Sequence, residues 1–341
     1  MTIFQNSAFS GFAGPMNNHC IRAMSSFDGL EHFEPAVEIF ANDIQVNAPW
    51  GLQRLSQGDG LDSPPRDPSL LANNDFRYTF NGRVGNLGKD VDIYIIDTGI
   101  NVDHVDFDGR ARWGFTVDTE TDEQGHGTHV AGTAAGSVWG VAKSANIIAV
   151  KVLGTRGTSE DILRGLDYVI KEHEKRSKES NFAGSIGSMS LGSSSRSPII
   201  DRAVAAANNI GIHFSVAAGN ESQDACRSSP AAASSFSSVV SVGAINVNDA
   251  RASFSNFGQC AQVYAPGEGI TSTWIGGTKK VNTIDGTSMA CPHVTGLMAY
   301  MLSQDSSLKT DPAALKEKVL KSAIEIQTDV GRVKVANNGF N

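Results

Sequence analysis

The segment Ile284-Asp285-Gly286-Thr287-Ser288-Met289-Ala290-Cys291-Pro292-His293-Val294-Thr295-Gly296 decides how the chain is interpreted. A Gly-Thr turn delivers a serine to the start of an apolar, helix-compatible run. This order predicts Ser288 in the first turn of a buried helix, where unpaired backbone N–H groups and the helix dipole stabilise negative charge. A serine at such a place is either an N-cap or a nucleophile. The choice depends on whether a base and an orienting acid occur elsewhere.

Length and composition describe a globular chain with a sizeable core. The 341 residues are 40% hydrophobic and 19% charged, which suits one large α/β domain with a small addition. The net charge of −8 argues against a nucleic-acid partner. No apolar run approaches the ~18 residues that span a bilayer, so no membrane partner is expected. The first ten residues lack the basic and apolar regions of a signal peptide.

Apolar strand patterns alternate with helical patterns along most of the chain. Strands are expected at residues 91–96, 145–153, 186–192, 212–218, 238–247 and 261–265, and helices at 130–136, 159–175, 201–209, after 288 and after 311. The spacing places Ser159 as the cap of one helix and Asp311, followed by Pro312, as the cap of the last. We therefore predict an α/β fold whose mostly parallel central sheet is covered by helices on both faces.

An acid and a histidine stand where such a fold places functional groups. Asp97 follows the first buried strand, and open α/β sheets bind ligands at the carboxyl ends of their strands. His126 lies between two glycines at a predicted helix start, which suits a general base that substrate must approach closely. His129 invites a metal hypothesis, but the zinc signature His-Glu-x-x-His is missing and His129 is expected to be structural.

The order Asp97, His126, Ser288 is the order of the triad in subtilisin-type proteases. The chain resembles that family, the subtilases, in five motifs: Asp97-Thr98-Gly99, Gly125-His126-Gly127-Thr128-His129-Val130-Ala131-Gly132, Ser190-Leu191-Gly192, Ala217-Ala218-Gly219-Asn220 and Gly286-Thr287-Ser288-Met289-Ala290. Within peptidase family S8 it is most similar to the proteinase K group and to its fungal vacuolar, cerevisin-like branch. The resemblance extends from about residue 48 almost to the C-terminus.

The resemblance implies a role for each matching residue in a serine endopeptidase. Ser288 would be the nucleophile, His126 the general base and then acid, and Asp97 the residue that orients the imidazole and stabilises its cation. The Asn220 side chain and the Ser288 backbone N–H would form the oxyanion hole. The mechanism would pass through an acyl-enzyme.

The resemblance also implies how substrate binds. Gly157-Thr158 and Ser190-Leu191-Gly192 would flank an extended peptide as neighbouring strands. The uncharged segment Ala217-Ala218-Gly219 would line the pocket before the cut, which implies broad specificity for apolar residues. The expected partners are protein or peptide substrates, acting on a monomer.

Residues 1–47 are expected to form a separate segment before a catalytic domain at 48–341. Their few apolar residues cannot build an independent core, and residues 10–47 resemble the later half of the family's inhibitory propeptide. The chain would then be a zymogen cut near Asn47-Ala48, with its own propeptide segment as a partner. The family implies the secretory pathway, vacuolar or extracellular. Because no signal peptide is present, either the N-terminus is truncated or this form does not enter that pathway.

Two positions distinguish the chain within the family, and a cysteine pair matches it. Asp285 stands where relatives often have a neutral residue, and its charge is expected to raise the pKa of His126. Gln262 replaces an aspartate that binds calcium in the proteinase K group; no cofactor is required, and calcium is not favoured there because this cation needs charged oxygen ligands. Cys226 and Cys260 match a pair that is bridged in some relatives, so the resemblance implies a disulfide.

Two other functions remain as alternatives. A non-catalytic member of the fold would bind peptides or a wall component. An esterase or lipase would need Gly-x-Ser-x-Gly and the order Ser, Asp, His, and the sequence around Ser288 has neither.

Overall fold

The structure is a computed structural model that describes residues 2–5, 10–24, 26, 30, 42–61, 71, 75–82, 84–154, 157–193 and 195–340. The chain divides into two compact units, Met1–Ala41 and Asn42–Asn341. The division falls a few residues before the expected boundary at 47/48, because strand β3 (Asn42–Ala48) pairs antiparallel with β4 (Phe76–Asn81) of the larger unit.

The smaller unit contains a hairpin and one helix. Strands β1 (Thr2–Gln5) and β2 (Ser10–Ala13) pair antiparallel, and α1 spans Asn18–Met24. Ile3 and Phe12 are exposed large apolar residues of this unit. The strand expected at Val37–Ala41 lies outside the described residues.

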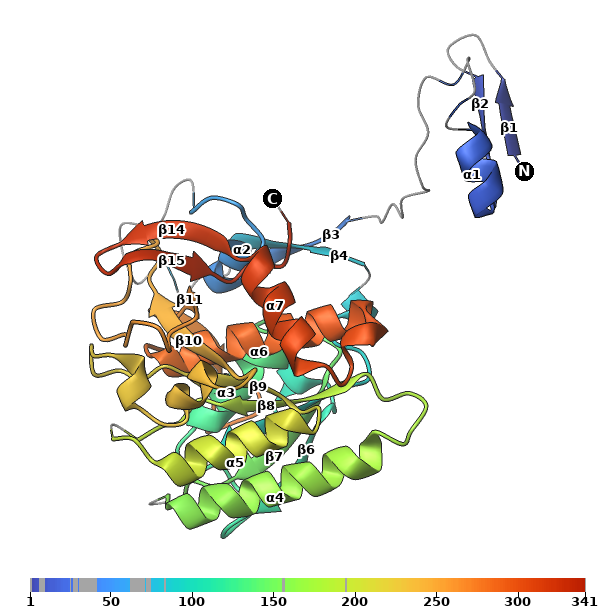
Figure 1. Cartoon of the computed structure of the whole chain (residues 1–341). Coiled ribbons are helices and arrows are strands. Elements are labelled where there is room, and N and C mark those ends of the chain that lie inside the picture. Colours follow the sequence, from blue (N-terminus) through green and yellow to red (C-terminus); the bar gives the residue numbers. More distant parts are fainter. Residues whose placement is uncertain are drawn as a thin grey trace. The chain divides into compact units, whose positions relative to one another are not determined.

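The larger unit alternates strands and helices as predicted (Figure 1). Its further strands are β5 (Val91–Asp97), β6 (Ala111–Thr116), β7 (Asn146–Lys151), β8 (Gly184–Met189), β9 (His213–Ala217), β10 (Val240–Ile245), β11 (Val263–Pro266), β12 (Ile270–Thr273), β13 (Val281–Ile284), β14 (Ile324–Thr328) and β15 (Gly331–Val335). Its α-helices are α2 (Trp50–Leu55), α3 (His126–Ala135), α4 (Ser159–Arg176), α5 (Pro198–Asn209), α6 (Thr287–Gln304) and α7 (Pro312–Ser322). Short 3-10 helices are η2 (Val84–Asn86), η3 (Val105–Phe107), η4 (Ala225–Arg227), η5 (Ala231–Ser235) and η6 (Ser306–Leu308).

A nine-stranded sheet forms the centre, in the order β14-β15-β11-β10-β9-β8-β5-β7-β6. Only the edge pair β14–β15 is antiparallel in this sheet as described. Strand β5 pairs with β7 on one side and with β8 on the other, so the strand order reverses there. In open α/β sheets this switch point is where ligands bind, and Asp97 is the last residue of β5.

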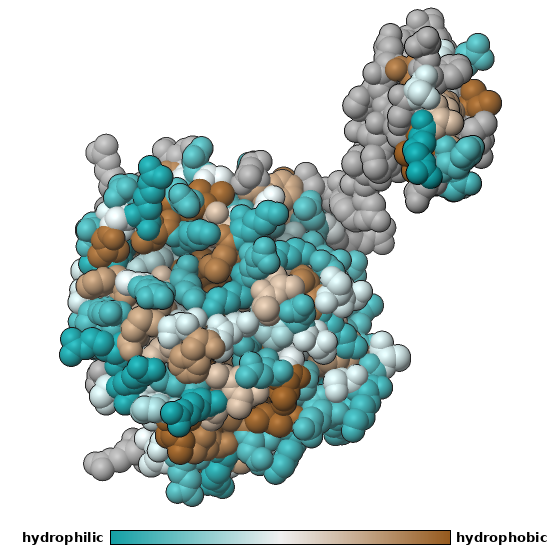
Figure 2. Space-filling model, viewed as in Figure 1, coloured by the Kyte–Doolittle hydropathy of each residue, from teal (hydrophilic) through white to brown (hydrophobic). Residues whose placement is uncertain are grey.

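Alternate residues of the central strands face two separate cores. Ile93 and Ile95 of β5 belong to a cluster with α3 and α6, whereas Tyr94 and Ile96 belong to a cluster with α4 and α5. Figure 1 shows α4 and α5 together on one face of the sheet. Helices therefore cover both faces, which confirms the predicted fold class. Figure 2 shows the visible face of this unit as largely hydrophilic with scattered apolar groups.

Of the two predicted helix caps, Asp311 is confirmed and Ser159 is wrong by one residue. The carboxylate of Asp311 accepts the Ala314 N–H at 2.9 Å, and Pro312 begins α7, as expected. Helix α4 is capped by Thr158 and not by Ser159: the Thr158 hydroxyl accepts the Asp161 N–H, and Asp161 accepts the Thr158 N–H in return. This reciprocal capping box satisfies two backbone donors at once and fixes the helix start one residue earlier. No helix among the described residues is long and apolar enough to cross a bilayer.

Candidate active site

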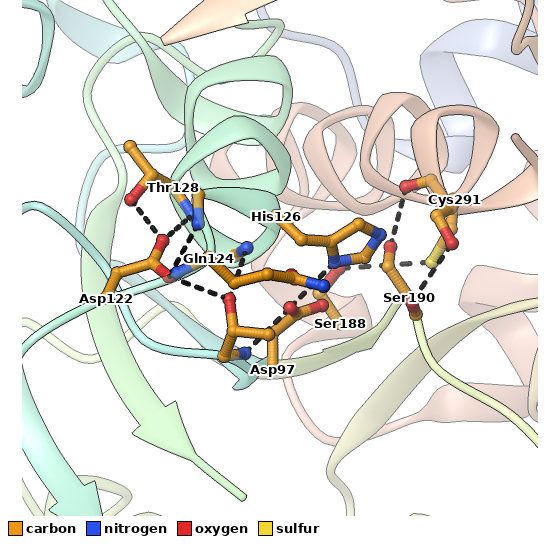
Figure 3. Close-up of polar contacts among 12 residues, drawn as sticks. Asp97, Asp122, Gln124, His126, Thr128, Ser188, Ser190 and Cys291 are labelled. Atoms are coloured by element: carbon orange, nitrogen blue, oxygen red, sulfur yellow. Dashed lines mark hydrogen bonds and ion pairs between the residues drawn. The ribbon is translucent and has the colours of Figure 1, made fainter. Parts of the chain in front are cut away.

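The carboxylate of Asp97 is buried at the end of β5 and points at His126. Asp97 is 0% exposed, and its Oδ1 lies 2.7 Å from Nδ1 of His126 (Figure 3). The same oxygen accepts the Thr98 N–H at 2.7 Å. The other oxygen, Oδ2, is buried without a hydrogen bond to any described residue. Asp97 therefore fixes one ring nitrogen of the histidine, which turns the opposite nitrogen, Nε2, away from the carboxylate.

His126 is the first residue of α3, and glycines shape its surroundings. Gly125 has φ +93°, a left-handed conformation that favours glycine. A Cβ atom on Gly127 would lie 2.2 Å from the Gly99 carbonyl oxygen, so the helix can approach the β5 loop only without a side chain there. Burial by itself lowers the pKa of His126, but the charge and hydrogen bond of Asp97 and the charge of Asp122 reverse this and raise it above the ordinary value.

Asp122 holds the turn that delivers His126, and the sequence did not single it out. One oxygen accepts the Gly125 N–H at 2.9 Å and the Thr98 hydroxyl at 3.0 Å; the other accepts the Thr128 N–H at 3.0 Å. Thr98 in turn accepts the Gly127 N–H at 2.9 Å. Figure 3 shows this network beside the Asp97–His126 pair. Asp122 thus ties both ends of the pair into one hydrogen-bonded unit.

Ser288 lies in the first turn of α6, as predicted, and it is bonded to Ser190. Its hydroxyl donates to the Ser190 carbonyl oxygen at 3.0 Å, and the Ser190 hydroxyl donates to the Ser288 carbonyl oxygen at 2.8 Å. Among the described residues no hydrogen bond joins Ser288 to His126. Ser190 lines a cavity of about 690 Å³ together with His126, so Ser288 is hydrogen-bonded to a residue of the cavity that the histidine borders.

Two candidate donors for a developing oxyanion, the Ser288 N–H and the Asn220 side-chain amide, lie next to Gly286. Oδ1 of Asn220 accepts the Thr287 N–H at 2.8 Å and the Thr287 hydroxyl at 2.9 Å, which orients the amide. A Cβ atom on Gly286 would lie 3.5 Å from the Ser288 backbone nitrogen and 3.7 Å from Asn220 Nδ2. Both nitrogens therefore border the volume that glycine leaves open at position 286.

Asn256 supports the segment that carries Asn220 and was also missed. It is 0% exposed. Its amide nitrogen lies 2.9 Å from the Ala218 carbonyl oxygen, and its amide oxygen accepts the Glu221 N–H at 3.1 Å. Its backbone N–H donates to the Gly219 carbonyl at 3.0 Å. A buried amide that pairs with backbone on both sides of Asn220 holds that loop in place.

The predicted substrate residues divide into two groups. Gly157, Thr158, Ser190, Leu191 and Gly192 line the cavity together with His126. Ala217, Ala218 and Gly219 are not part of that lining; they lie at the end of β9, directly before Asn220. The cavity also has an apolar group that sequence reasoning did not name: Leu153, Ile162 and Ile200.

The remaining sequence features have structural partners. Cys226 and Cys260 form a disulfide, as the resemblance implied, and Cys291 is a buried free thiol near Ser188 and Ser215. His129 is buried and lies 2.9 Å from the Ile270 carbonyl oxygen, and burial lowers its pKa to about 3. The part of the chain that the structure describes has no group of three His, Cys, Asp or Glu residues placed to hold a metal ion.

Asp285 does not act where the sequence suggested. Its carboxylate accepts the Gly269 N–H at 2.6 Å, and its charge adds to burial in raising the pKa of Glu268. The carboxylates that raise the pKa of His126 are Asp97 and Asp122. Asp285 is not among the charges that raise this pKa, and its carboxylate is bonded to the Gly269 N–H directly before β12.

The site combines an acid–histidine pair at the switch point of a parallel sheet with a helix-start serine bonded to Ser190, which lines the same cavity as the histidine. This combination defines a serine-hydrolase type of site. A family model makes the class specific: residues 88–340 match the subtilase family, Peptidase_S8. The chain belongs to this family.

Characterised relatives cover most of the chain. It is 43% identical over 343 residues to subtilisin-like serine protease Cla h 9.0101 of Davidiella tassiana, covering 94% of this chain and 63% of that protein. It is 43% identical over 336 residues to alkaline protease 2 of Aspergillus fumigatus, covering 93% of this chain and 64% of that protein. The chain thus spans somewhat less than two thirds of the length of these relatives.

A solved structure agrees with the fold. The crystal structure of a cold-adapted subtilisin-like serine proteinase superposes with a TM-score of 0.71 at 36% identity, covering 86% of this chain and 98% of that one.

Proposed function

We propose that the chain is a serine endopeptidase that hydrolyses peptide bonds through Asp97, His126 and Ser288. The observation that carries this proposal is the 2.7 Å contact between a fully buried carboxylate and His126 Nδ1, beside a cavity that His126 lines together with Ser190, the hydrogen-bond partner of Ser288. A histidine so fixed has one nitrogen left for proton transfer. Family membership supports the same chemistry.

The reaction would begin with rotation of the Ser288 hydroxyl from the Ser190 carbonyl to Nε2 of His126. Ser288 Oγ attacks the substrate carbonyl carbon while His126 accepts the hydroxyl proton. The tetrahedral oxyanion receives hydrogen bonds from the Ser288 N–H and from Asn220 Nδ2. His126 then gives its proton to the leaving amine, and the acyl-enzyme is hydrolysed by water that His126 deprotonates in turn.

The substrate we infer is an extended protein or peptide segment. It would lie between Gly157-Thr158 and Ser190-Leu191-Gly192, which both line the cavity. Leu153, Ile162, Leu191 and Ile200 supply apolar lining, which favours apolar side chains on the acyl side of the cut. The backbone and small residues Ala217, Ala218 and Gly219 would complete a broad, uncharged primary pocket.

We further propose that residues 1–47 are propeptide-like and that a monomeric protease matures by a cut near Asn47-Ala48 in the secretory pathway. The separate compact unit at Met1–Ala41 supports a distinct segment. N-terminal sequencing of purified protein tests this: a start at or near Ala48 is expected, and an active protein that begins at Met1 would contradict it.

Labelling with a fluorophosphonate probe tests the enzyme itself. Wild type should be labelled at Ser288, with the adduct located by tryptic mapping, and Ser288→Ala should not be labelled. Ser306→Ala, at an exposed serine beyond α6, is the matched control and should react like wild type. Folded wild-type protein that stays unlabelled would overturn the proposal and favour a peptide-binding member of the fold.

A further inference from the structure

A cation lies among backbone carbonyls beside Gln262, the residue that stands where the family resemblance expects a calcium-binding aspartate. Nζ of Lys316, on α7, lies 3.1, 2.9 and 3.1 Å from the carbonyl oxygens of Ser234, Ser237 and Val239. We call these three oxygens the carbonyl cluster. They belong to η5 and to the segment that leads into β10 (Figure 1).

The ammonium group is matched to these acceptors by geometry and not by an opposite charge. Among the described residues no carboxylate forms an ion pair with Lys316, unlike the buried Lys151, which pairs with Asp118 at 2.7 Å. An ammonium offers three N–H donors, one for each carbonyl, whereas a neutral amine offers two. Burial lowers the pKa of Lys316 to about 8, so the side chain is still an ammonium at neutral pH.

The neighbouring residue is Gln262, which stands where the family resemblance expects a calcium-binding aspartate. Its Nε2 donates to the Ser234 carbonyl at 2.9 Å, so Gln262 and Lys316 share one oxygen of the carbonyl cluster. Its own oxygen, Oε1, is buried without a hydrogen bond to any described residue. The side chain therefore supplies a donor and no negative charge.

These residues do not fit a calcium ion. Calcium takes six to eight oxygen ligands at about 2.3–2.6 Å, usually with carboxylates among them. Here a neutral amide replaces the carboxylate, and the carbonyl oxygens already surround a positive charge that would repel a divalent cation. We propose that the ammonium group of Lys316 replaces the structural calcium ion and crosslinks α7 to the η5–β10 segment.

A tethered cation has a different consequence for stability from a bound one. A bound metal stabilises the fold in proportion to the logarithm of its free concentration, and a chelator removes it. Lys316 is part of the chain, so its contribution is independent of calcium. This contribution of Lys316 is measured by unfolding and does not depend on whether the protein is catalytically active.

Thermal unfolding of full-length protein in the Ser288→Ala background, which prevents self-digestion, tests this inference. Unfolding is followed by circular dichroism with excess EDTA and with millimolar calcium chloride. We expect the Ser288→Ala protein with an intact Lys316, called wild type in this test, to unfold at the same temperature with EDTA and with calcium. Lys316→Met should unfold roughly 5 °C lower in both, because three carbonyls lose their charged donor. The exposed Lys321 on the same helix gives the control, Lys321→Met, which should match wild type.

A double variant tests whether a calcium site can be restored in place of the ammonium group. Gln262→Asp combined with Lys316→Ala restores a carboxylate beside the carbonyl cluster and removes the ammonium. Its unfolding temperature should rise with calcium and fall with EDTA. The proposal is overturned if Lys316→Met unfolds at the wild-type temperature. It is also overturned if calcium raises the unfolding temperature of wild type as much as that of the double variant. The same holds if calcium does not change the unfolding temperature of a folded double variant.

Discussion

Asp97 Oδ1 lies 2.7 Å from His126 Nδ1, while Asp97 Oδ2 has no hydrogen-bond partner among the described residues. One oxygen therefore carries the whole orienting contact. Replacing the carboxylate with an amide could present an N–H donor in place of an acceptor to Nδ1 of His126. It would also remove the charge that stabilises the imidazolium.

We expect Asp97→Asn to lower kcat by roughly 10⁴-fold at neutral pH with little change in KM, the scale of losing a triad aspartate. Steady-state kinetics on a peptide amide measures this. Asp103→Asn, at an exposed aspartate, is the control and should retain wild-type activity. A loss below about tenfold in Asp97→Asn would show that this carboxylate does not orient the base.

The charge of Asp122 gives a prediction about pH. Asp122 raises the pKa of His126, and catalysis needs neutral His126, so activity is lost as the pH falls through that pKa. Asp122→Asn should lower the pKa and move the acid limb of kcat/KM to lower pH, with reduced kcat because the turn is loosened. Glu123→Gln removes an exposed charge next to it and should leave the limb in place. Asp285→Asn should do the same; if it moved the limb and Asp122→Asn did not, the assignment would be reversed.

Thr287 and Asn220 give a graded test of the oxyanion hole. Asn220→Ala should lower kcat by roughly 10²–10³-fold, the cost of one such donor, with KM nearly unchanged. Thr287→Val removes the hydroxyl that donates to Asn220 Oδ1 at 2.9 Å, and a loss of about tenfold is expected for one orienting hydrogen bond. Thr287→Ser keeps that hydroxyl and should recover most of the activity. Equal activity of Thr287→Val and wild type would remove Thr287 from this role.

The disulfide predicts a stability loss without an activity loss. Cys226 and Cys260 are 34 residues apart, and closing a loop of this size contributes about 4 kcal/mol in the chain-entropy model. The double variant Cys226→Ser/Cys260→Ser should therefore unfold at a clearly lower temperature while retaining kcat at low temperature. Ser306→Ala, at an exposed serine of the catalytic domain, is the control. Unchanged unfolding in the double variant would show that the bridge does not constrain the unfolded chain.

The sequence was sufficient for residues whose local surroundings are distinctive. Asp97 ends a run of β-branched residues, and His126 and Ser288 are each preceded by glycine-containing turns, so strand end and helix start could be predicted directly. The parallel sheet followed from the alternation of patterns, and the Cys226–Cys260 bridge from family resemblance. Apart from the disulfide, these features depend on short segments and can be predicted without tertiary contacts.

The residues that were missed depend on distant partners. Asp122 stands among other acidic and polar residues and resembles a solvated loop, yet five hydrogen bonds make it the support of the histidine turn. Asn256 and Lys316 resemble ordinary turn and surface residues. Their roles follow from backbone groups brought in from 33 or more positions away, such as the Gln223 and Glu221 N–H groups for Asn256, and no local pattern encodes that.

The reciprocal bonds between Ser190 and Ser288 hold the Ser288 hydroxyl at the Ser190 carbonyl, so the proposed nucleophile would have to be released before it reacts. A peptide that pairs with Ser190-Leu191-Gly192 needs the carbonyl oxygens of that segment as acceptors, and the Ser190 carbonyl is the one that holds the Ser288 hydroxyl. Docking of the substrate backbone would displace the hydroxyl and free it to turn toward His126. Release of the Ser288 hydroxyl would then depend on how much peptide backbone is bound. Small esters and short amides would therefore react slowly even where their acyl group fits.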